Sequence, residues 1–149
     1  MFAAALLWFA TASEISRNLT AAAEELLKIE KKIAGSNEGL GSILYEDVLT
    51  LLDEAIEEDP ANLHAHARAS EVLLLRSDQG DGTFDICSLL DARNEAEYVL
   101  KHGGDAADSA TARGTLHAIQ AIPPDEIPDP PSSCGESEEQ RHGSKTRSS

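Results

Sequence analysis

Residues 45–76, from Tyr45 to Arg76, read YEDVLTLLDEAIEEDPANLHAHARASEVLLLR, and this stretch decides the fold. Its first half predicts an amphipathic helix, because apolar residues recur at every third or fourth position. Proline lacks a backbone N–H and disfavours the helical conformation in the residue before it, so Asp59-Pro60 must end that helix. Asn62 then fits the N-cap of a second helix. Two helices joined so closely form an antiparallel or steeply crossed pair around one apolar interface.

The rest of the chain adds further helices to this pair. Residues 86–102 and 107–121 show helical apolar spacing, and Gly103-Gly104 ends the first of these two segments. A long N-terminal helix is predicted from a heptad-like apolar seam, which consists of Ala5, Trp8, Ala12, Ile15, Leu19, Ala22, Leu26, Ile29 and Ile33. We therefore expect an all-α fold of about five helices.

Composition supports one helical domain. The chain has 149 residues, enough for a modest core, and it is 41% hydrophobic but only 4% aromatic. Such an aliphatic core suits closely packed helices better than sheets. Five of the six prolines fall within residues 123–131. We therefore expect a helical domain over residues 1–122 and a disordered Pro-rich, polar tail over residues 123–149.

The charge balance limits the class of partner. The formal net charge is −15, from 27 acidic and 12 basic residues. Nucleic acids and anionic membranes attract clustered Lys and Arg, so neither is expected as a partner, whereas a basic protein segment would be attracted.

Residues 2–10 form an apolar run that is too short to span a bilayer. Residues 1–12 are either a signal segment or the start of the first helix. We expect a cytoplasmic location, with secretion as the alternative.

No motif for catalysis or for a cofactor is found. Cys87 lies among apolar residues and Cys134 in a polar tail, so we expect no disulfide, and a reducing compartment.

His64 and His66 point to different sides of a helix, so one metal ion cannot easily be held by both. Residues 78–85 lack the ligand order of a calcium loop. The carboxylates of residues 53–59 lie on a polar helix face. Without a nucleophile–base pair, we expect a non-enzymatic protein with no cofactor and no metal.

One spacing occurs twice near the ends of helices. It is formed first by Val48, Leu52, Ala55 and Pro60, and again by Ala92, Ala96, Val99 and Gly104. The next helix in each case has a small residue, Ser70 or Gly114, eight places from its start. This pattern resembles the tetratricopeptide repeat, a helix–turn–helix unit of about 34 residues. The phrase DEAIEEDPANLHA, Asp53 to Ala65, is similar to the end of one such repeat and the start of the next. The resemblance covers residues 45–121.

The resemblance implies a short right-handed array of antiparallel helix hairpins with a groove that binds a partner segment. It therefore predicts a non-catalytic protein–protein interaction module. The residues expected to contact the partner are His66, Ala69, Ser70, Leu73, Ala110, Arg113 and Gly114. Two alternatives stay open: a structural protein that self-associates through its first helix into a homo-oligomer, and a secreted or membrane-associated protein that uses residues 2–12.

Overall fold

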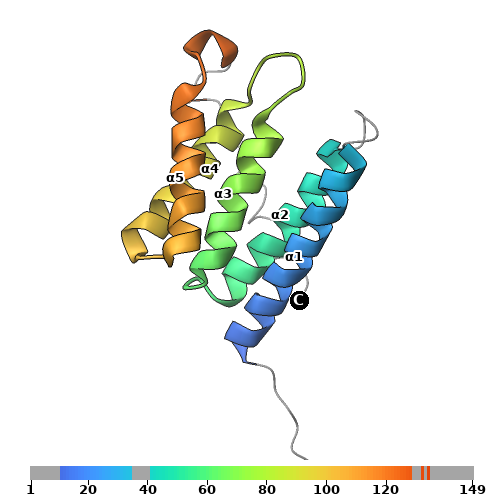
Figure 1. Cartoon of the computed structure of the whole chain (residues 1–149), viewed down its shortest axis with the longest axis vertical. Helices are drawn as coiled ribbons and strands as arrows, with labels where there is room; N and C mark the ends of the chain where they lie inside the picture. Colours follow the sequence, from blue (N-terminus) through green and yellow to red (C-terminus); the bar gives the residue numbers. More distant parts are fainter. Residues whose placement is uncertain (1–10, 35–40, 129–131, 133, 135–149) are drawn as a thin grey trace, which may run out of the picture.

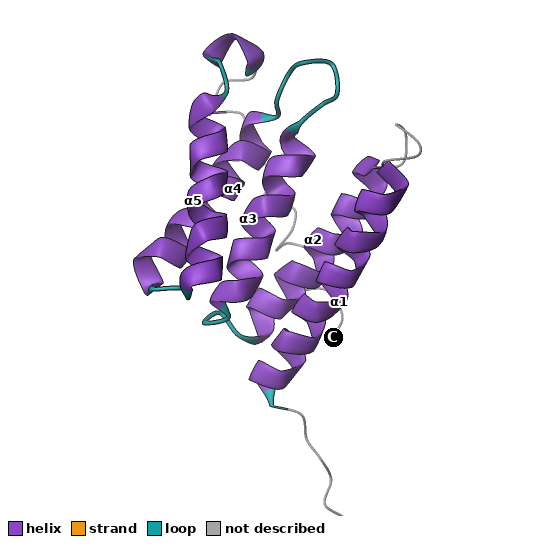
Figure 2. Ribbon diagram, in the orientation of Figure 1, coloured by secondary structure: helices purple, strands orange, loops and turns teal. Residues whose placement is uncertain are grey.

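The computed structural model describes residues 11–34, 41–128, 132 and 134. Within these ranges the elements are α1 (Ala12–Ala34), α2 (Gly41–Glu58), α3 (Leu63–Ser77), α4 (Ile86–His102), α5 (Ala106–Ala121) and the short 3-10 helix η1 (Pro124–Glu126). The described residues contain no strand, only an isolated bridge between Asp78 and Phe84. The predicted all-α fold is confirmed (Figure 2).

Successive helices run antiparallel, and they form two layers. α1, α3 and α5 lie side by side in one layer, with α2 and α4 behind them (Figure 1). α3 is central, because it packs against each of the other four helices. In the described part of the chain, α1 and α5 do not pack on each other. Any link between these two outer helices must therefore pass across α3.

Local sequence signals set the ends of the helices. α2 ends at Glu58, just before Pro60. The Asn62 Oδ1 accepts a hydrogen bond from the Ala65 N–H over 3.2 Å, so Asn62 caps α3 as predicted. After α4, Gly103 adopts a left-handed φ of 74°, which a residue without a Cβ takes up most readily.

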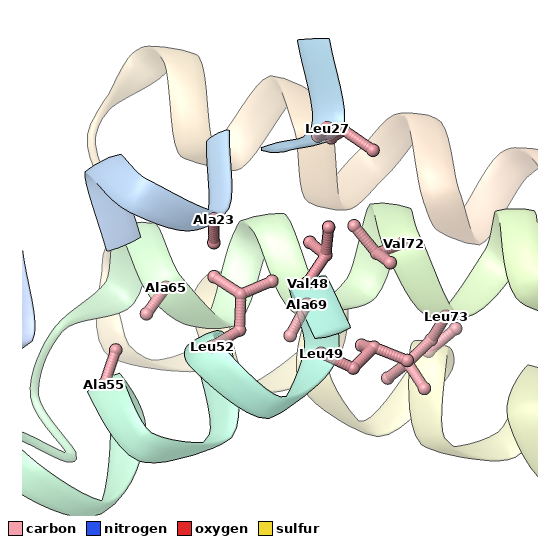
Figure 3. Close-up of a cluster of buried hydrophobic side chains, with 11 residues drawn as sticks. Ala23, Leu27, Val48, Leu49, Leu52, Ala55, Ala65, Ala69, Val72 and Leu73 are labelled. Atoms are coloured by element: carbon pink, nitrogen blue, oxygen red, sulfur yellow. The ribbon is translucent and has the colours of Figure 1, made fainter. Parts of the chain in front are cut away.

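The core is aliphatic and lies on both sides of α3. The larger cluster joins α1, α2 and α3 (Figure 3) and reaches α4 through Ala92; it contains Ala23, Leu27, Val48, Leu49, Leu52, Ala55, Ala65, Ala69, Val72, Leu73 and Ala92. The smaller cluster joins α3, α4 and α5 through Ala67, Ala96, Val99 and Ala112. Small residues at these contacts let the helix backbones approach closely. The apolar faces predicted for α2, α3 and α4 are confirmed at their central positions.

The seam predicted for the first helix is wrong at most of the positions that the structure describes. Ile15 and Ile29 are 38% and 50% exposed, whereas Leu19 and Leu26 are partly buried against the core. The buried stripe is shifted by one residue, to Ser16, Thr20, Ala23, Leu27 and Glu30. The Ser16 hydroxyl donates to the Ala55 carbonyl over 2.6 Å, so small and hydroxyl side chains bring α1 against α2. Ala5 and Trp8 lie outside the described residues, as does the side chain of Ile33.

The start of the predicted tail is structured. η1 lies against the loop before α4, where the Phe84 N–H donates to the Glu126 carbonyl over 2.8 Å. Further along the chain, Cys134 lies beside Cys87 at the start of α4. Their Cα atoms are 5.1 Å apart, and the two cysteines form a disulfide. The expectation of two unpaired cysteines is therefore wrong. The disorder predicted for the tail otherwise falls on residues 129–131, 133 and 135–149, outside the described residues.

The N-terminal residues 1–10, for which a signal or a helix start was predicted, also lie outside the described residues. Among the helices that are described, none combines the length and apolar character needed to cross a bilayer.

Candidate interaction surface

Charged side chains gather where α1, α3 and α5 lie side by side. On α3 they follow one helical row, His64, Arg68 and Glu71, which continues to Leu75. Leu75 is 36% exposed, and the side chains of His64, Arg68 and Glu71 are 42%, 32% and 27% exposed. We call this surface the α1–α3–α5 face, and it comprises Glu24, Lys31, His64, Arg68, Glu71, Leu75 and Asp108.

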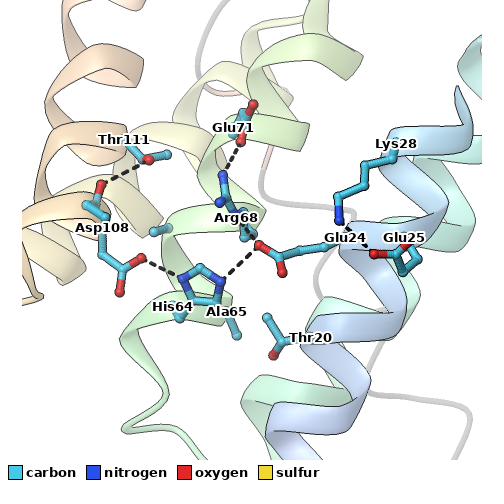
Figure 4. Close-up of polar contacts among 12 residues, drawn as sticks. Thr20, Glu24, Glu25, Lys28, His64, Ala65, Arg68, Glu71, Asp108 and Thr111 are labelled. Carbon is cyan, nitrogen blue, oxygen red and sulfur yellow. Dashed lines mark hydrogen bonds and ion pairs between the residues drawn. The ribbon is translucent and has the colours of Figure 1, made fainter. Parts of the chain in front are cut away.

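His64 is the centre of this face, because its ring lies between two carboxylates from different helices (Figure 4). The Nδ1 atom is 2.6 Å from the Asp108 Oδ1 on α5. The Nε2 atom is 2.9 Å from the Glu24 Oε1 on α1. The ion pairs thus reach across α3 and connect the two outer helices.

Arg68 extends the network along α3. Its Nε donates to the Glu24 Oε1 over 2.7 Å, and its Nη1 donates to the Glu71 Oε2 over 3.0 Å. The Lys31 Nζ from α1 lies 3.3 Å from the other oxygen of Glu71. Acidic and basic groups therefore alternate over the face, and each of these ion pairs crosses between helices or joins adjacent turns of α3.

The electrostatic surroundings shift the pKa values of both central groups. Burial alone would lower the pKa of His64, but the hydrogen bond and charge of Asp108, followed by those of Glu24, raise it above the ordinary 6.5. Burial would raise the pKa of Glu24, but Arg68 and His64 together lower it. The face is therefore arranged to hold an imidazolium between two carboxylates.

A second histidine occupies a different environment two residues later. His66 is buried, and its Nδ1 is 2.5 Å from the Glu95 Oε2 on α4. Its Nε2 is 3.0 Å from the Pro60 carbonyl oxygen, and its ring stacks on Tyr98 at 4.3 Å between ring centres. His66 therefore joins α3 to α4 and to the turn before α3, away from the α1–α3–α5 face.

The residues expected to bind a partner are not brought together on one surface. Four of them, all on α3, are buried at helix contacts: His66, Ala69, Ser70 and Leu73. A buried side chain cannot contact a partner, so this part of the prediction is corrected. The other three, Ala110, Arg113 and Gly114, are exposed on α5. The prediction missed His64, Arg68 and Glu71, although their helical spacing in the sequence marks the polar side of α3.

The side chains that the structure describes bear on two kinds of chemistry, that of a metal site and that of a serine nucleophile. In residues 11–34, 41–128, 132 and 134, no three His, Cys, Asp or Glu side chains converge in a way that could hold a metal ion. Three buried serine hydroxyls donate to backbone carbonyls, Ser16 to Ala55, Ser70 to Ala67 and Ser77 to Leu74, and the buried Ser88 hydroxyl donates to the Asp85 carboxylate. Each of these hydroxyl protons is therefore used in a hydrogen bond within the fold.

Comparisons with known proteins add no relative. Neither a family model, nor a curated protein sequence, nor a solved structure matches the chain.

Proposed function

We propose that this protein is a non-catalytic interaction module that binds a segment of a partner protein on the α1–α3–α5 face. The observation that carries the proposal is the row of partly exposed charged side chains across three adjacent helices, backed by a second helix layer. The same alternation of front and back helices occurs in tetratricopeptide arrays, which the repeated spacing in the sequence resembles. The proposal of a non-catalytic role is supported by two kinds of potential nucleophile that are already bonded. Cys87 is in a disulfide, and the Ser16 and Ser70 hydroxyls donate to backbone carbonyls.

The partner segment is proposed to be basic. The chain carries a formal net charge of −15, which attracts cations over long range. α2 carries exposed carboxylates such as Glu54 and Glu58. The exposed residues Ala110, Arg113 and Gly114 of α5 remain candidates for contact with the partner. Binding should therefore weaken as ionic strength rises, because salt screens exposed charges.

The test is a selection from a random peptide library displayed on phage, followed by affinity measurements on the enriched peptides. Glu71→Lys and Leu75→Lys add positive charge to the α1–α3–α5 face, whereas Glu97→Lys makes the same kind of charge change at an exposed position of α4. We expect both face variants to weaken binding at least tenfold and the α4 variant to bind like the wild type. Equal binding by all three variants, or no enriched peptide, would contradict the proposal.

Self-association is the second candidate, and the exposure of Ile15 and Ile29 on α1 favours it. Two isoleucines about four helical turns apart on one side would pack against a second helix. Light scattering over a range of concentrations tests this, with Ile15→Glu/Ile29→Glu as the variant. A monomer mass at all concentrations for the wild type would eliminate the candidate.

The disulfide favours the secreted alternative over a cytoplasmic location, because disulfides persist mainly in oxidising compartments. N-terminal sequencing of protein purified from its native source would decide this. Loss of the first residues supports secretion, and an intact Met1 opposes it.

A further inference from the structure

The hydrogen-bond geometry of His64 favours its protonated form. Both ring nitrogens face carboxylate oxygens, Asp108 at 2.6 Å and Glu24 at 2.9 Å. An ionised carboxylate can only accept a hydrogen bond, so each ring nitrogen must donate one. Only the imidazolium has two N–H groups. The arrangement seen in the structure is therefore that of a protonated His64.

Every charged group that faces this ring can be named. α1 contributes Glu24, with Lys28 beyond it; α3 contributes Arg68, which bonds the same Glu24 oxygen; and α5 contributes Asp108. Between pH 6 and pH 9 a carboxylate paired with Arg stays ionised, and Arg and Lys stay charged. Among these groups the imidazole is the one whose ordinary pKa, 6.5, lies in that range.

Loss of the proton must change the link between α1 and α5. A neutral imidazole has a single N–H, so it can donate to Glu24 or to Asp108 but not to both. The released carboxylate then faces a nitrogen lone pair, and the two carboxylates lose the positive charge between them. The backbones of α1 and α5 do not approach each other directly in the described residues, so without the bridge these helices are connected only through the elements between them.

We propose that His64 is a pH-dependent brace, which holds α1 and α5 at a fixed separation across α3 while it is protonated and lets them separate when it is neutral. The inference concerns the fold itself and holds whether or not the α1–α3–α5 face binds a peptide. If the face does bind one, its width and therefore its affinity will change with pH.

Two measurements on the full chain test the brace. The first is the ¹⁵N NMR spectrum of the histidine rings, in which His64 should show two protonated nitrogens at pH 6 and one at pH 9. The second is the distance between nitroxides on α1 and α5, measured by pulsed electron resonance. Attaching the labels to ketone-bearing residues at the exposed positions Ala21 and Ala110 leaves the Cys87–Cys134 disulfide intact.

At pH 6 the wild type should give one narrow distance distribution, which lengthens and broadens by pH 9. His64→Gln should give the same distribution at both pH values. His117→Gln, at an exposed position of α5, should behave like the wild type. The proposal is overturned by a neutral His64 ring at pH 6, by an unchanged wild-type distribution, or by a pH response in His64→Gln equal to that of the wild type. The ring spectrum needs no variant, so the proposal stays testable even if His64→Gln does not fold.

Discussion

The side-chain amide of Asn62 donates a hydrogen bond to the Ser16 hydroxyl over 2.8 Å, which joins the start of α3 to α1. The Ser16 hydroxyl donates its own proton to the Ala55 carbonyl, so its oxygen can accept the hydrogen bond from Asn62. The same amide group lies 3.1 Å from the Thr20 hydroxyl, and its oxygen caps α3. Asn62→Ala removes both functions, and we expect a loss of about 2 kcal/mol in the free energy of unfolding, measured with urea.

Asn62→Asp separates the two roles of this side chain. Aspartate still caps α3 with its oxygen, but it cannot donate to Ser16 or Thr20. We expect a loss of stability for this variant as well, because a carboxylate would face two hydroxyls whose protons are already used. If Asn62→Asp is as stable as the wild type, the cap alone matters and the contact with α1 contributes nothing.

Much of the fold could be predicted because its signals are local. Pro60, Asn62 and Gly103 each act within one turn of the chain, and the structure ends or begins helices beside them. The buried stripe of α1 could not be predicted in this way. Residues 15, 22 and 29 are apolar and residues 16, 23 and 30 are mixed, so hydrophobicity favours the first set. The partners of Ser16 lie 39 and 46 residues away, and these tertiary hydrogen bonds select the second set.

The candidate site was less predictable for the same reason. His64 binds residues 40 and 44 positions away, which no local spacing reveals. The resemblance to a repeat family directed attention to His66, two residues further on and on a different side of α3. The disulfide closes over 47 residues, and it depends on how η1 directs the chain back toward α4. In each case the sequence shows the residue type but not the contact.

Glu30 should destabilise the protein at neutral pH. It is 1% exposed, and within the part of the chain that the structure describes neither carboxylate oxygen has a hydrogen-bond partner. Burial raises the pKa of Glu30 above its ordinary value of 4.5, against a smaller lowering by Lys31. The folded protein thus binds this proton more tightly than the unfolded chain, and stability falls as pH rises from 4.5 toward the folded pKa. Glu30→Met, which removes the buried oxygens, should add about 2 kcal/mol at pH 7.

The gain from Glu30→Met should shrink at pH 4, where the native carboxyl is neutral. Urea unfolding at the two pH values measures this difference. Glu54→Gln, at an exposed position of α2, serves as the control and should change little. A destabilised Glu30→Met at pH 7 would show that the carboxylate has a favourable partner.

Two glycine-to-alanine changes should have opposite effects. A Cβ on Gly104 would lie 2.7 Å from the Cγ1 of the fully buried Val99, so Gly104→Ala should cost about 2 kcal/mol. A Cβ on Gly114, within α5, would meet no heavy atom within 4 Å. Gly114→Ala should therefore add about 0.5–1 kcal/mol through helix propensity. Thermal unfolding of the two variants checks both signs, and a stabilised Gly104→Ala would contradict the packing of Val99 against the α4–α5 turn.

Reduction of the Cys87–Cys134 disulfide should lower the melting temperature. The bond closes a loop over 47 residues, and the entropy of such a loop in the unfolded chain corresponds to about 4 kcal/mol. Melting with and without a phosphine reductant measures the change. The Cys87→Ser/Cys134→Ser variant should melt at the lower temperature and not respond to reductant. Alkylation of two free thiols in the native, unreduced protein would contradict the pairing.

The contact between His66 and Glu95 predicts a stability that falls at alkaline pH. Burial would lower the pKa of His66, but the hydrogen bond and charge of Glu95 and the Pro60 carbonyl raise it above 6.5. The contribution of this contact is therefore complete below pH 6.5 and is lost as pH rises through the folded pKa. Glu95→Gln should cost about 2 kcal/mol at pH 6, because a charged hydrogen bond at a buried ring becomes a neutral one.

The cost of Glu95→Gln should be smaller at pH 9, since the wild type has then lost the same interaction. Glu97→Gln lies on the same helix but removes only a surface pair with Arg93, 3.1 Å long and more than half exposed, so it should be nearly neutral at both pH values. Urea unfolding of the wild type and both variants at pH 6 and pH 9 makes the comparison. A Glu95→Gln cost that does not change with pH would mean that His66 keeps its proton to pH 9 or never carries it. The ring ¹⁵N spectrum used for His64 distinguishes these two cases, because the first gives two protonated nitrogens at both pH values and the second gives one at both.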